Sequence, residues 1–73
     1  MATASKNTTG TENKQYDIVS ILYHALEGAA SCDQYIADAR KAKDEEVVSF
    51  LEQTQEEYRR LAEQAKALLK ARL

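Results

Sequence analysis

One apolar repeat, with alternating spacings of four and three residues, limits what this chain can fold into more than any other feature. In the first half of the chain it occupies Ile18, Leu22, Ala25, Ala29, Cys32, Ile36 and Ala39. After a short polar break it returns at Val47, Leu51, Thr54, Tyr58, Leu61, Ala65 and Leu68. These spacings place each set on one face of an α-helix. The sequence therefore predicts an all-α fold of two long helices, each burying the face that carries its repeat.

The polar break predicts where the first helix ends and the second begins. Lys41 and Lys43 suit the C-terminus of a helix, and Asp44 is a favourable N-cap for the next one. We expect a first helix over about residues 12–42 and a second over about residues 45–72. Similar lengths and a short connection favour an antiparallel hairpin. One continuous helix is the alternative.

The N-terminal residues are polar and are expected to stand apart from the hairpin. Residues 1–10 should form a disordered tail, because they contain almost no large apolar side chains. The helical hairpin is predicted over residues 11–73. A capping box of Thr9 and Glu12 could begin the first helix, and Asn13 is the alternative cap.

The size of the chain points to an assembly. A chain of 73 residues rarely builds a self-sufficient core, and its only cysteine, Cys32, excludes a disulfide within one chain. The apolar arc of the first helix spans about 200°, which is wider than one neighbouring helix covers. We therefore expect a homodimer in which two hairpins form a four-helix bundle, with a higher homo-oligomer as the alternative. The expected interface residues are Tyr16, Ile18, Val19, Leu22, Tyr23, Leu26 and Ala29.

Two residues are predicted to have structural roles inside the hairpin. The antiparallel register places the large Tyr58 level with the small Ala29, so Tyr58 is expected in the buried face. Asp33 lies within the apolar arc of the first helix. It either reaches solvent at the edge of the bundle or makes a polar contact that fixes the register. Arg40, Thr54 and Tyr58 are the candidate partners for that contact.

No cofactor is predicted, although iron is an alternative. His24 and Glu27 are three residues apart and could share a metal ion, with Glu56 completing a site across a dimer interface. Solvated side chains on a polar face are the simpler interpretation. No catalytic residues are predicted, because no nucleophile motif or phosphate-binding loop occurs. Tyr16 and Tyr23, on the outer face of the first helix, suggest a further alternative, an adaptor that binds a partner protein.

Charge and composition argue against several partners. The net charge is −2, and no basic patch suited to phosphates stands out, so nucleic acid is not an expected partner. No apolar run is long enough for a membrane span. The absence of a secretory signal and the free cysteine predict a cytoplasmic protein.

Two segments, YDIVSILYHALEGAASCDQYI and DEEVVSFLEQTQEEYRRLAEQAKALL, resemble helical hairpins of the ferritin-like superfamily, of the short encapsulated-ferritin and rubrerythrin type. The resemblance implies a four-helix bundle built from two hairpins. The family's metal site uses an inward glutamate, for which Glu27 is the nearest match, and a Glu-x-x-His pair on the second helix. At the aligned positions this chain has Tyr58 and Leu61. The resemblance therefore implies the fold without ferroxidase activity, in a homo-oligomeric structural or interaction module.

Overall fold

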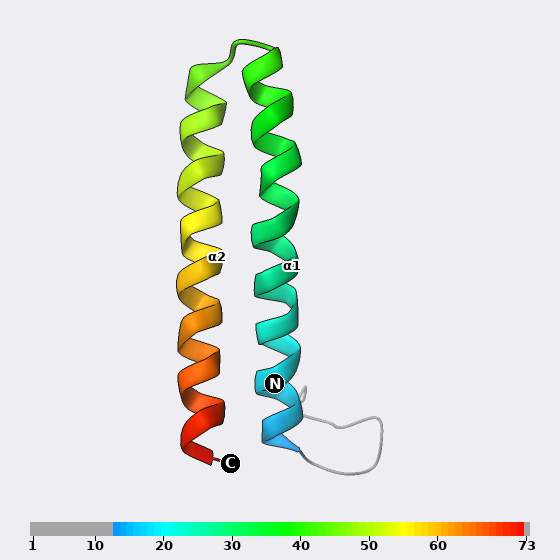
Figure 1. The fold of residues 1–73 in the computed structure, drawn as a ribbon, viewed down its shortest axis with the longest axis vertical. Coiled ribbons are helices and arrows are strands. Elements are labelled where there is room, and N and C mark those ends of the chain that lie inside the picture. The colour runs from blue at the N-terminus through cyan, green and yellow to red at the C-terminus, as the bar shows by residue number, and fades with distance from the viewer. Residues whose placement is uncertain (1–12, 73) are drawn as a thin grey trace, which may run out of the picture.

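The computed structural model describes residues 13–72, which form two helices of 28 residues each. Helix α1 spans Lys14–Lys41 and helix α2 spans Glu45–Arg72. The helices lie side by side and run antiparallel (Figure 1). The prediction of an all-α hairpin is thus confirmed, and the alternative of one continuous helix is wrong. The predicted tail, residues 1–10, lies outside the described residues.

Helix α1 begins at a side-chain cap. Asn13 has an extended backbone, and its Oδ1 accepts a hydrogen bond of 2.9 Å from the backbone N–H of Tyr16. The Asn13 carbonyl accepts the first helical bond, from the N–H of Asp17. Asn13 therefore satisfies a donor that the helix itself leaves free. Thr9 and Glu12, the other predicted cap, lie outside the described residues.

The two helices are joined by a three-residue turn, residues 42–44. The N–H of Lys43 donates to the carbonyl of Arg40 at 2.9 Å, and the N–H of Asp44 donates to the carbonyl of Ala39 at 3.0 Å. This pair of bonds is a Schellman motif, which usually has glycine where this chain has Lys43, at a φ of 60°. The Asp44 carboxylate then accepts from the N–H of Val47 at 3.3 Å and begins α2.

We call the line of contact between the two helices the seam. Every member of the repeat predicted to be buried on α1 lies in it. Ile18, Leu22 and Ala29 are half-buried, and the buried members are Ala25, Cys32, Ile36 and Ala39. Most of these side chains are small, which lets the two backbones approach closely.

The buried face of α2 differs from the predicted one. Val47, Leu61 and Leu68 were expected in the seam and are exposed. Their neighbours Val48, Ala62 and Leu69 face α1. At Ala62 the seam holds a small side chain, where a leucine would keep the helices apart. Leu51 and Ala65 of the predicted repeat do pack against α1, and the other residues of the seam are Val48, Gln55, Ala62 and Leu69.

Charged side chains cover the outer surface of α2. Glu56 lies 3.7 Å from Arg59, and Glu63 lies 3.1 Å from Lys66, both as pairs three residues apart. Exposed pairs of this kind stabilise a helix only slightly. Within the described part of the chain, neither helix is both long enough and apolar enough to cross a membrane.

Candidate interaction surface

Tyr58 packs directly against Gly28 at the middle of the hairpin. A Cβ atom added to Gly28 would lie 2.7, 2.8 and 2.9 Å from three atoms of the Tyr58 ring. The ring therefore occupies space that only glycine leaves open. This contact is one residue from the predicted level of Ala29 with Tyr58. The expectation of a buried Tyr58 is wrong, because the side chain packs at the margin of the seam and remains 36% exposed.

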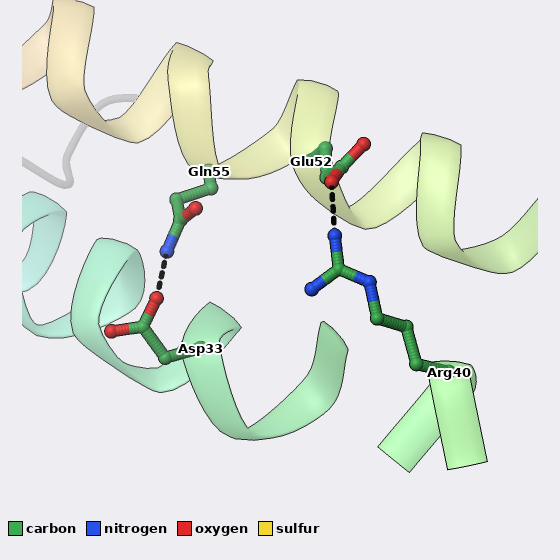
Figure 2. Close-up of polar contacts among 4 residues, drawn as sticks. All are labelled: Asp33, Arg40, Glu52 and Gln55. Carbon is green, nitrogen blue, oxygen red and sulfur yellow. Dashed lines mark hydrogen bonds and ion pairs between the residues drawn. The ribbon is translucent and has the colours of Figure 1, made fainter. Parts of the chain in front are cut away.

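A polar contact crosses the seam next to this ring. Gln55 is buried, and its Nε2 donates to the carboxylate of Asp33 at 2.8 Å and to the carbonyl of Ala29 at 2.7 Å. Figure 2 shows the amide of Gln55 pointing from α2 towards Asp33 on α1. Asp33 itself is exposed, so it both reaches solvent and makes an interhelical contact. None of the three partners considered from the sequence is the one observed.

A second polar contact lies closer to the turn. Arg40 Nη2 donates to the carboxylate of Glu52 at 2.8 Å, again from α1 to α2 (Figure 2). Asp33 and Arg40 are one heptad apart and thus share one side of α1. Both interhelical polar contacts therefore cross the same side of the seam. We call this side of the hairpin the polar side.

The opposite side of the hairpin carries large apolar residues from both helices. Placing residues 100° apart separates Ile21, Gly28 and Tyr35 from Asp33 and Arg40 by more than a quarter turn of α1. The large apolar residues of this side are also more than a third exposed. We call them the apolar face: Ile21, Tyr35, Val47, Phe50, Tyr58, Leu61 and Leu68.

Two open grooves lie along the apolar face. The end groove, near the open end of the hairpin, has a volume of about 660 Å³, and Ile18, Ile21, Leu61 and Leu68 are among its lining residues. The middle groove, of about 380 Å³, is lined in part by Gly28, Tyr35, Tyr58 and Leu61. Leu61 borders both grooves. The apolar face thus contains two grooves, whereas two polar contacts link the helices on the polar side.

The residues predicted for a dimer interface are divided between different environments. Ile18, Leu22 and Ala29 are half-buried in the seam, and Ile18 also borders the end groove. The others are exposed side chains of α1: Tyr16, Val19, Tyr23 and Leu26. Helical periodicity puts these four on the side of α1 away from the apolar face.

The residues considered for a metal site are only partly brought together. His24 Nδ1 lies 3.9 Å from Glu27 Oε1, and both side chains are exposed. Tyr23 donates to the other oxygen of Glu27 at 3.4 Å, whereas Glu56 pairs with Arg59 on α2. Among residues 13–72, no cluster of three or more histidine, cysteine or acidic side chains could hold an ion.

Neither the interhelical role of Gln55 nor the presence of Tyr35 and Phe50 on one face was predicted from the sequence. A signal for Gln55 was present, because residues 48, 51, 55, 58, 62, 65 and 69 also follow spacings of three and four. This second repeat contains a glutamine and two alanines, so it is less apolar than the one chosen. Periodicity alone could not decide between the two repeats.

Comparison with known protein families, with curated proteins and with solved structures finds no match to this chain. The two-helix hairpin is therefore established by its own geometry, and no relative supports the ferritin-like resemblance.

Proposed function

We propose that this chain is a non-catalytic structural or interaction module that works as a homodimer. Two hairpins would form a metal-free four-helix bundle of ferritin-like architecture. The observation that carries the proposal is an inverted distribution of side-chain size. Of the apolar residues buried within residues 13–72, only Ile36 and Val48 are larger than alanine or cysteine, whereas eleven large apolar residues in this range are at least 36% exposed.

This distribution is unfavourable for an isolated hairpin. Fully burying a large apolar side chain contributes about 1.5–3 kcal/mol relative to leaving it in water. Small side chains in the seam contribute much less, and a chain of this size has little other core. A partner that covers the exposed apolar residues would supply the missing burial. A second copy is always present at the same concentration and can satisfy this requirement without another protein.

Native mass spectrometry of the metal-free protein tests the proposal directly. We expect a species at twice the chain mass of 8.2 kDa. A folded protein that remains monomeric at micromolar concentration would overturn the proposal. The same measurement after incubation with ferrous iron should show no added metal mass. Stoichiometric iron per dimer would favour the iron-binding alternative and direct mutagenesis to His24 and Glu27.

One observation favours a second candidate, the adaptor function. Tyr16 and Tyr23 are one heptad apart on α1, and both remain exposed. Exposed tyrosines are frequent in protein interfaces. If these rings bind a partner, Tyr16→Ser with Tyr23→Ser should leave the helix content and the dimer unchanged and abolish recovery of that partner. Equal recovery of the partner by the unchanged protein and by the double variant would contradict this candidate.

A further inference from the structure

We propose that the second copy docks with its apolar face against that of the first, and that the two copies are antiparallel. The two-fold axis that relates them runs across both helices at the level of Gly28 and Tyr58. In this arrangement Tyr35 and Phe50 of each copy enter the end groove of the other. The inference rests on the proposed homodimer and adds its face and its orientation. It places the interface away from Val19 and Leu26, which the sequence favoured.

The two sides of the seam differ in what they can offer a partner. On the polar side, Asp33–Gln55 and Arg40–Glu52 link the helices, and Glu56, Arg59, Glu63 and Lys66 lie along the outer surface of α2. Burying these charged groups would cost free energy. Among residues 13–72, no such polar contact crosses the apolar face, where both helices supply large apolar side chains. The apolar face is therefore the side that gains most from being covered.

The dimensions of the apolar face fit a stable interface. Each helix has 28 residues, which corresponds to about 42 Å at 1.5 Å per residue. Two adjacent helices give a face about 20 Å wide. The projected area is then about 800 Å², which is what each partner buries in a protein interface of standard size.

The orientation follows from where the projections and the hollows lie. Gly28 and Tyr58 are within one residue of the midpoints of their helices. Tyr35 and Phe50, 52% and 64% exposed, lie seven and eight residues from these midpoint residues towards the turn, or about 10–12 Å. They are also level with each other across the seam, because the register that pairs residue 28 with 58 pairs residue 35 with about 51.

The end groove lies at a matching distance on the other side of the midpoint. Ile18 and Ile21 are ten and seven residues before Gly28, and Ala65 and Leu68 are seven and ten residues after Tyr58. These separations correspond to about 10–15 Å. A two-fold rotation about the midpoint therefore brings the aromatic pair of each copy over the end groove of its partner. Such self-complementarity is what an isologous interface requires.

A pair of matched variants tests which face is used. Leu61→Glu places a charge at the border of both grooves, and Leu26→Glu places one at the same level on the other side of the hairpin, at a similar exposure of 49% against 41%. By sedimentation equilibrium, Leu61→Glu should raise the dimer dissociation constant at least about tenfold, and Leu26→Glu should change it by less than about threefold.

The outcomes separate the inference from the proposed function. If Leu26→Glu weakens the dimer as much as Leu61→Glu or more, or if neither variant weakens it, the face is wrongly assigned and the homodimer stands. If the unchanged protein is a monomer, the proposed function fails as well. Helix content by circular dichroism accompanies each measurement, so that loss of folding is not mistaken for dissociation.

Crosslinking tests the orientation in proteins that keep the dimer. In a Cys32→Ala background, Phe50→Cys and Leu68→Cys are prepared separately, mixed and treated with a short bis-maleimide. Antiparallel packing should give the mixed crosslinked dimer, whereas two copies of Phe50→Cys should not link, because their thiols are about 24 Å apart. A dimer of Phe50→Cys linked to itself, or the absence of the mixed species from an intact dimer, would overturn the inference.

Discussion

Lys43, in the turn, adopts a backbone conformation that its side chain disfavours. Its φ of 60° lies in the left-handed region, where a Cβ atom meets the neighbouring carbonyl at a cost of about 1–2 kcal/mol. Glycine is the usual residue at this point of a Schellman motif. Here the turn is maintained without a glycine. Lys43 and Asp44 donate hydrogen bonds to the end of α1, and the Asp44 side chain caps α2.

Lys43→Gly should therefore stabilise the protein. We expect its free energy of unfolding to rise by about 0.5–1 kcal/mol, because relief of strain exceeds the added freedom of the unfolded chain. Urea unfolding at a fixed protein concentration measures the change. Lys43→Ala is the control, since it removes the charge and keeps the Cβ atom. An equal gain for both variants would show that charge, and not φ, is the cause.

Gly28 and Tyr58 should be strongly coupled. In a Tyr58→Ala background, Gly28→Ala should stabilise α1 by about 1 kcal/mol, because alanine is the better helix former. In the otherwise unchanged chain this gain should be lost, because the new Cβ would lie within 2.9 Å of the Tyr58 ring. A double-mutant cycle in urea should give a coupling of about 0.5–2 kcal/mol. Additive effects would contradict the observed packing.

At the scale of the helices, sequence periodicity predicted one buried face and misplaced the other. In helix α1 the predicted repeat is apolar at all seven positions, and it lies in the seam. In α2 two repeats with spacings of three and four compete. Choosing the larger side chains selected Leu61, whereas the structure buries its neighbour Ala62. Helix positions could be predicted because they depend on local spacing, but the rotation of α2 depends on contacts made across the seam.

Gln55 supplies one of those contacts and should contribute measurably to stability. Gln55→Ala removes both hydrogen bonds of Nε2 and should lower the free energy of unfolding by about 1–2 kcal/mol. Gln53→Ala, an exposed position in the same helix, should change it by less than about 0.5 kcal/mol. Thermal or urea unfolding of the two variants provides the comparison. Equal effects would mean that the contact with Asp33 contributes nothing to the hairpin.

For the whole molecule, folding and assembly should be a single equilibrium. The hairpin buries mainly small side chains and exposes most of its large ones, so its stability should depend on the partner that covers them. The candidate surface could not be derived from the sequence, because its two halves come from different helices. The predicted rotation of α2 relative to α1 was wrong. In the observed rotation of α2, Leu61 and Phe50 lie with Ile21 and Tyr35 on the apolar face.

The midpoint of thermal unfolding should accordingly depend on protein concentration. Two chains unfolding together have an enthalpy of about 80 kcal/mol, so tenfold dilution should lower the midpoint by about 6 °C. Circular dichroism at 222 nm over a hundredfold range of concentration measures this. A midpoint independent of concentration would indicate a hairpin that is stable alone.

The three-residue turn also has a consequence for the order in which the chain folds. Residues that face each other beside residues 42–44 are close in sequence, whereas those at the open end are the farthest apart. Chain closure therefore costs least conformational entropy beside the turn, and such local contacts are typical of rapidly folding helical proteins. We expect the helices to come together from the turn outward. The Asp33–Gln55 contact should then form before the end groove takes shape.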